Sequence, residues 1–225
     1  MGLSYYLQQS FVQHALIAGA LVAIISGLIG PFVITRSMAF AVHGTAELSF
    51  TGAAAGLVVA DDPLAGALVG SLVVASAFAV LGGRDKDRDS AIGVVLAFGL
   101  GAGVFLLSQY RGFASAATNI LFGQIFGISS RQLVLLLVVA VAVLVAMSAL
   151  YRPLLFASVD PEVAAARGVP VRLVGLLFLF VLALTVPEAA QIVGPLLVLS
   201  LAITPAAAAP RLPARPGVVT PLSGL

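Results

Sequence analysis

The chain has 225 residues, of which 61% are hydrophobic and 9% are charged, with a formal net charge of +2 and no cysteine. A soluble globular domain carries about 25% charged residues, so this composition excludes an ordinary water-soluble fold and predicts a chain that lies largely in lipid. No basic cluster is present that could neutralise phosphates, which excludes a nucleic-acid-binding protein. The absence of cysteine excludes disulfides and thiolate metal ligands.

Apolar segments of membrane-spanning length follow one another along the chain. A helix needs about 20 apolar residues to cross the hydrocarbon core, and five segments are close to that length: Ala15–Thr35, Met38–Ala60, Leu64–Leu81, Ser90–Gln109 and Gln132–Tyr151.

A sixth apolar stretch, Leu173–Ala209, would be about 55 Å long as one helix, which is too long for one crossing. Pro187, Gly194 and Pro195 are the predicted points of a break. We therefore expect an all-α bundle of about seven transmembrane spans over residues 1–209. A Pro-rich, non-helical cytoplasmic tail is expected at residues 210–225.

Basic residues indicate the orientation, because Lys and Arg concentrate in cytoplasmic loops. With the N-terminus outside and seven spans, the outer loops hold only Arg111 and Arg131. The other nine basic residues then lie on the inner side, at Arg36, Arg84, Lys86, Arg88, Arg152, Arg167, Arg172, Arg211 and Arg215. If Leu173–Ala209 formed a single span, only Arg211 and Arg215 would move to the outer side. The distribution of Lys and Arg therefore indicates the orientation, but it does not decide whether there are six or seven spans.

Small residues are spaced for close helix packing in the second and third predicted spans. Gly52 and Gly56 form one GxxxG pattern, and Gly66 and Gly70 form another. In lipid, close backbone approach supplies much of the contact between helices. The alternative is that spans rich in alanine and glycine match this pattern by chance.

The second predicted span contains the strongest candidate for a metal site. His43 and Glu47 are four residues apart, so a helix places both on one face, one turn apart. An imidazole nitrogen and a carboxylate oxygen can share a divalent ion. The alternative is a His–Glu pair that only holds helices together. Two ligands do not complete a site, so a third would come from another helix or a partner subunit.

Glu188 and Gln191 lie at the predicted break in the long apolar stretch. Transporters place ion-contacting groups at broken helices within the membrane, so both residues are candidate metal contacts. The alternative is a break at the outer surface with Glu188 simply solvated.

The predicted inner loop 152–172 contains the signals of a short helix. Asp160 is a predicted N-cap, Pro161 a first-turn proline, and Gly168 a C-terminal glycine, with Glu162 in the first turn. The alternative is an ordinary helix at the membrane surface.

This loop resembles the coupling-helix signature of the zinc/manganese/iron-type ABC transporter permeases, roughly F-D-P-E-x-A-x-x-x-G-[VL]-P, with only the Phe displaced, to Phe156. Four further segments resemble motifs of the same family in the same order. They are Phe32–Phe40, Asp89–Gly93, Asn119–Ile125, and Val193–Val198 together with Ile203–Ala209. The resemblance covers about residues 15–209.

The resemblance implies the membrane subunit of an ABC importer for a divalent metal ion, zinc or manganese, in the plasma membrane. It implies two copies that form the path, a cytoplasmic ATPase and an external metal-binding protein as partners, and no tightly bound cofactor. Asp160, Glu162, Ala165 and Gly168 would then transmit movement from the ATPase. No Walker-type G-x-x-x-x-G-K-[ST] is present, so ATP hydrolysis is expected in the partner and not in this chain.

The chain departs from the family pattern in two respects. Family members commonly carry Asp and His, four residues apart, where this chain has His43 and Glu47. That exchange leaves the preferred metal open. Members usually continue for one or two more spans, so the resemblance implies a chain shortened at its C-terminal end.

Two other functions are alternatives. A permease for a metal chelate of the siderophore or cobalamin type would need a wider path. An intramembrane enzyme would need a fuller motif, and the sequence has neither H-E-x-x-H nor G-x-S-x-G.

Overall fold

The structure is a computed structural model that describes residue 5 and residues 8–81, 88–110, 119–120 and 122–208. Its described part contains helices and no strand, so the all-α prediction is confirmed for it. The helices are α2 (Ser10–Thr35), α3 (Ala39–Ala60), α4 (Pro63–Leu81), α5 (Arg88–Gln109), the 3-10 turn η1 (Ile125–Gly127), α7 (Ser130–Val159), α8 (Pro161–Ala166), α9 (Val171–Val193) and α10 (Pro195–Ala208). The predicted tail, residues 210–225, lies outside the described residues.

Three of these helices are long and apolar enough to cross a membrane by length and composition within the described residues: α2, α7 and α9. Shorter apolar helices cover Pro63–Ala79 and Gly93–Gln109. The 14 residues of α10 would extend about 21 Å, which is less than the hydrocarbon thickness of about 30 Å. Every predicted span therefore has a helix, while the number that cross stays a prediction.

Two predicted interruptions are wrong. The fifth predicted span was expected to end at Tyr151, but α7 continues through Pro153 to Val159, so the first part of the predicted loop is helical. Leu154 and Ala157 are buried there, and their packing stabilises the extra turns. Pro187 does not break the last stretch either, because it lies inside α9. The break occurs at Gly194, between α9 and α10, which is one of the predicted positions.

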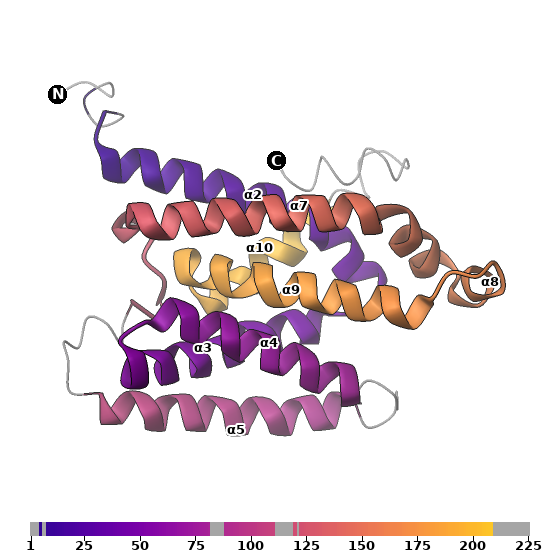
Figure 1. Cartoon of the computed structure of the whole chain (residues 1–225), viewed down its shortest axis with the longest axis horizontal. Coiled ribbons are helices and arrows are strands. Elements are labelled where there is room, and N and C mark those ends of the chain that lie inside the picture. Colours follow the sequence, from indigo (N-terminus) through magenta and orange to yellow (C-terminus); the bar gives the residue numbers. More distant parts are fainter. Residues whose placement is uncertain (1–4, 6–7, 82–87, 111–118, 121, 209–225) are drawn as a thin grey trace.

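The helices lie in tiers, as Figure 1 shows, with α2 and α7 on one side, α9 and α10 through the middle, and α3, α4 and then α5 on the other side. α9 contacts α2, α3, α4, α7 and α10, and it therefore forms the centre of the bundle. α7 begins at the end where α3 turns into α4, and it runs to α8 at the opposite end. Below, these are called the α3–α4 end and the α8 end.

The glycines of α3 and α4 bring the two helix backbones into contact. A Cβ built on Gly56 would lie 2.7 Å from the Cα of Gly66, and one built on Gly52 would lie 2.8 Å from the Cα of Gly70. Real Cβ atoms do not approach backbone this closely, so glycine is required at this crossing. The predicted packing role of both GxxxG patterns is confirmed.

Candidate functional site

His43 and Glu47 form a pair on α3. His43 Nε2 lies 3.1 Å from Glu47 Oε1, and the two side chains are 32% and 17% exposed. The predicted one-turn spacing is therefore confirmed as a side-chain contact. His43 Nδ1 is buried and has no hydrogen-bond partner among the described residues. The pair can offer one imidazole nitrogen and one carboxylate to an ion.

The pair is not joined by a third ligand of the usual kind. In the described part of the chain, no three His, Cys, Asp or Glu side chains lie close enough to hold a metal ion together. A four-coordinate site needs further donors. Among the described residues, His43 and Glu47 therefore supply two donors of this kind, and a four-coordinate site would need others.

Glu188 and Gln191 line a cavity of about 210 Å³ near the α3–α4 end. Glu188 is 5% exposed, so its side chain is buried rather than solvated at the open surface. Glu188 Oε1 and Gln191 Nε2 are buried atoms without a hydrogen-bond partner among the described residues. The polar side chains around them in the cavity wall are Ser49, Asn119, Gln124 and Gln132.

The two candidate pairs lie on different helices, His43 and Glu47 on α3 and Glu188 and Gln191 on α9. Neither His43 nor Glu47 belongs to the cavity wall that contains Glu188. The sequence predicted four metal-contact residues, and the structure places them as two separate pairs.

The break between α9 and α10 has an external hydrogen-bond donor. Pro195 has no N–H to offer the carbonyl of Gln191, four residues earlier. The backbone N–H of Gln124 donates to that carbonyl instead, over 3.1 Å. Gly194 takes a positive φ of 87° at the turn, and Gly123 in the facing segment takes a φ of 73°. The segment around Gly123 therefore completes the broken helix and closes one side of the cavity.

The docking of the segment around Gln124 on the helix break is not among the predictions made from the sequence. A signal was present in Pro195, because a proline at that position leaves the Gln191 carbonyl in need of another donor. Which segment would supply the donor depends on tertiary packing.

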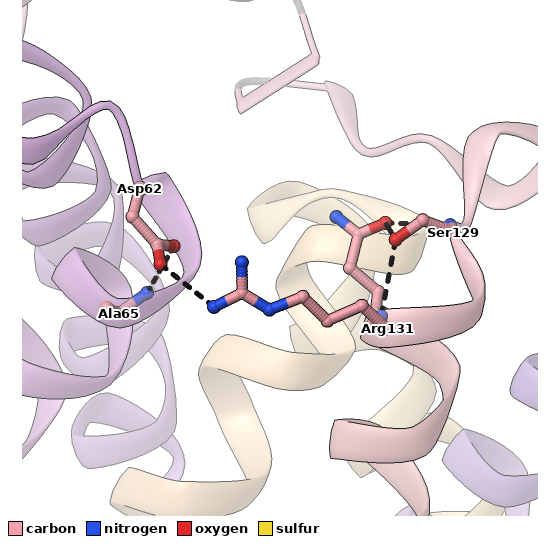
Figure 2. Close-up of polar contacts among 5 residues, drawn as sticks. Asp62, Ala65, Ser129 and Arg131 are labelled. Carbon is pink, nitrogen blue, oxygen red and sulfur yellow. Dashed lines mark hydrogen bonds and ion pairs between the residues drawn. The ribbon is translucent and has the colours of Figure 1, made fainter.

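Asp62, at the corner between α3 and α4, forms an ion pair with Arg131, at the start of α7. Figure 2 shows the Arg131 guanidinium reaching Asp62, with Nη2 3.5 Å from Oδ2. The other carboxylate oxygen of Asp62 accepts from the backbone N–H of Ala65 at 3.1 Å. Arg131 is 84% exposed, so the ion pair is a weak surface contact. The sequence alone predicts only that Arg131 lies in an outer loop.

A second hollow lies between these two elements, at the same end as the cavity. Ala60, Asp61, Asp62, Ser129 and Arg131 line it, and it shares Pro63, Leu64 and Gln132 with the Glu188 cavity. The hollow and the cavity are therefore adjacent.

The predicted short helix is present as α8 with the predicted caps. Asp160 Oδ1 accepts from the backbone N–H groups of Glu162 and Val163, at 3.1 and 3.0 Å. At the other end, Gly168 has a φ of 83°, and its N–H donates to Ala165 while that of Val169 donates to Ala164. This pairing is a Schellman motif.

The exposed and buried residues of α8 divide its surface into two faces. Ala164 is fully buried and fixes the helix to the bundle. Glu162 and Ala165 are exposed. The predicted coupling residues are thus available to a partner, while contact with a partner stays a prediction.

Comparison with known proteins gives one family for most of the chain. Residues 8–224 match the ABC 3 transport family. An uncharacterised membrane protein of Synechocystis is 34% identical over 204 residues, which cover 90% of this chain and 73% of that protein. The manganese transport system membrane protein MntC of Halalkalibacterium halodurans is 33% identical over 204 residues, covering 90% of this chain and 70% of MntC.

Two further similarities extend this result. The manganese import system permease protein ScaB of Streptococcus parasanguinis is 32% identical over 206 residues, covering 90% of this chain and 72% of ScaB. The structure of PsaBC from Streptococcus pneumoniae in complex with Fab superposes with a TM-score of 0.85 at 28% identity. That superposition covers 96% of this chain and 78% of the matched chain.

Proposed function

The chain belongs to the ABC 3 transport family, and we propose that it is the membrane-spanning permease subunit of an importer that carries a divalent metal ion into the cell. MntC and ScaB, which resemble it over most of its length, are named for manganese transport. Manganese is therefore the first candidate for the cargo, and zinc is the second.

The His43–Glu47 contact is the observation that carries this proposal. A histidine and a glutamate, 3.1 Å apart and partly exposed, stand in a helix that is otherwise apolar or small. Ionisable groups within membrane helices are costly, and they usually mark an ion path. One nitrogen and one oxygen ligand suit Mn²⁺ or Zn²⁺. Two ligands bind an ion less tightly than a complete set of four, which suits a site from which a transported ion must be released.

A second copy of the chain would complete the path. The pair is partly exposed on one copy, and it lacks a third ligand within that copy's described residues. A homodimer that brings two such pairs together would supply up to four ligands, the number of a tetrahedral site. Glu188 and Gln191 are proposed as further contacts for the ion at another point of the same route.

The proposed partners act at the two ends of the bundle. A cytoplasmic ATPase would bind α8 through its exposed residues Glu162 and Ala165, with Asp160 and Gly168 holding the shape of the helix. A metal-binding protein would deliver the ion outside, at the α3–α4 end. We propose seven spans in the plasma membrane with the N-terminus outside, and ATP hydrolysis only in the partner subunit.

The alternative cargo, a metal chelate of the siderophore or cobalamin type, is not favoured. MntC is named for manganese transport, and a relative from Thermotoga maritima is named as a probable metal transport protein. The cavity of about 210 Å³ is also smaller than the 300–1,000 Å³ that pockets for drug-sized molecules have.

The test is metal uptake by cells that express the chain with its ATPase and binding protein. His43→Ala combined with Glu47→Ala should abolish uptake of ⁵⁴Mn²⁺ while the protein still inserts into the membrane. His43→Asp combined with Glu47→His restores the order of ligand types found in the family and should retain uptake. Unchanged uptake by the double alanine variant would remove the pair from the mechanism. Competition by Zn²⁺ in the same assay distinguishes the two candidate metals.

A further inference from the structure

The cavity at Glu188 has the chemistry of a second cation site, distinct from the His43–Glu47 pair. Glu188 is the one charged residue in the described wall of the cavity, and no Lys, Arg or His is part of that wall. Its side chain is 5% exposed, and its Oε1 atom has no partner among the described residues. A buried carboxylate without a partner is costly unless something in the cavity compensates it.

Gln191 adds a second group in the same position. It lies three residues after Glu188 on α9, so both side chains are on one face of the helix. Its Nε2 atom is also buried without a partner in the described part of the chain. One unpaired acceptor and one unpaired donor line the same space without bonding to each other. That arrangement fits an occupant that can both donate and accept, and water has this property.

The size of the cavity indicates what accompanies the ion. A single water needs about 10–15 Å³ of such volume, and the cavity offers about 210 Å³. A bare divalent ion would be surrounded by empty space there. One carboxylate also leaves most positions of a six-coordinate oxygen site unfilled. Waters bound to the ion would fill both the space and the coordination positions, and they would donate hydrogen bonds to Glu188.

We propose that this cavity is an entry chamber that holds a divalent cation together with its hydration water, before the ion loses water at His43 and Glu47. The chamber lies at the α3–α4 end, beside the hollow bordered by Asp62 and Arg131. Selection in the chamber is by charge, because Glu188 contacts the bound waters. Selection between metals is left to the His–Glu pair. This inference rests on the proposed function for its cargo and direction, while binding in the chamber is measurable without transport.

The experiment measures Mn²⁺ binding to the purified full-length chain in lipid nanodiscs. Electron paramagnetic resonance counts bound Mn²⁺, and pulsed detection of water protons reports its hydration. The variant His43→Ala with Glu47→Ala should retain binding of Mn²⁺ that carries several waters. Adding Glu188→Gln to that variant should weaken this binding about tenfold or more, since it removes the charge and keeps the shape.

Two matched variants complete the design. Asp61→Asn removes a carboxylate at the same end of the bundle but outside the cavity wall, and it should leave the affinity unchanged. Gln191→Glu adds a second carboxylate to the chamber and should strengthen Mn²⁺ binding.

The outcomes separate the chamber from the proposed function. Equal Mn²⁺ binding with and without Glu188→Gln, or bound Mn²⁺ that has lost all its water, would overturn the chamber and leave the transport assignment intact. Loss of binding in Glu188→Gln, together with full uptake by the His43→Ala, Glu47→Ala variant, would support the chamber and reject the His–Glu path.

Discussion

The backbone N–H of Gln124 donates to the carbonyl of Gln191 over 3.1 Å, and this bond joins a loop to the broken end of a helix more than sixty residues later in the chain. Pro195 makes the bond necessary, because it cannot donate to that carbonyl itself. The same bond holds the wall of the Glu188 cavity in place. A backbone contact therefore helps to position a cavity wall that combines segments far apart in sequence.

The turn at this break should be sensitive to any side chain on Gly194. Gly194→Ala would strain a residue with φ 87° by roughly 1–2 kcal/mol, and its Cβ would lie 2.7 Å from the carbonyl oxygen of Phe122. We expect less folded monomer after heating in detergent, measured by size-exclusion chromatography. Gly101→Ala is the matched control, because a Cβ there has open space. Equal heat resistance of the two variants would contradict the strain at the break.

The crossing of α3 and α4 should tolerate no added methyl group. In Gly66→Ala the new Cβ would lie 2.7 Å from the Cα of Gly56, and the two backbones would have to separate. Overpacking of this kind costs about 1–3 kcal/mol. The same heating assay should show this loss, again against Gly101→Ala. A variant as heat-resistant as the native chain would mean that the two helices can move apart without cost.

The cap of α8 should control binding of the ATPase. Asp160→Ala removes the acceptor for two backbone N–H groups and should destabilise this short helix by about 1 kcal/mol. Asp160→Asn keeps a side-chain oxygen at the cap. We expect co-purification with the ATPase subunit to fall in the alanine variant and to persist in the asparagine variant. If both variants co-purify like the native chain, the coupling role of α8 is rejected.

The orientation of the chain can be tested with single cysteines, because the native sequence has none. Val163 on α8 is 45% exposed, and Phe126 in η1 is 65% exposed. η1 precedes the start of α7 and α8 follows its end, so the two residues flank opposite ends of this helix. A membrane-impermeant maleimide added to intact cells should label Phe126→Cys and spare Val163→Cys. In inverted vesicles the labelling should be reversed. The opposite result would place the N-terminus inside.

The positions of the helices could be predicted from the sequence because hydrophobic length directly reflects the thickness of a bilayer. Their ends were harder to predict. A proline inside a helix removes one hydrogen bond, and the outcome depends on what packs around it. Pro153 and Pro187 lie within α7 and α9 beside buried residues, so these helices continue. At Pro195 the preceding glycine takes a positive φ, so the helix ends there.

The candidate site was predictable only in part, for a related reason. The His43–Glu47 contact depends on four-residue spacing within one helix, and that spacing is visible in the sequence. The chamber around Glu188 is built from α3, α4, α7, α9 and the segment near Gln124. A cavity of that kind exists only after those elements pack. Local spacing could therefore identify Glu188 and Gln191 as unusual residues, but not the space that they line.

The 30 residues of α7 correspond to about 45 Å of helix, while the hydrocarbon layer is about 30 Å thick. A helix of this length is about 15 Å longer than the hydrocarbon layer, so in the proposed topology the excess would lie among and beyond the lipid headgroups. α8 follows α7 directly, so in that topology it would lie at or beyond the headgroup layer rather than within the lipid. Such a position would leave α8 open to the proposed ATPase, and α7 would connect that contact to the rest of the bundle.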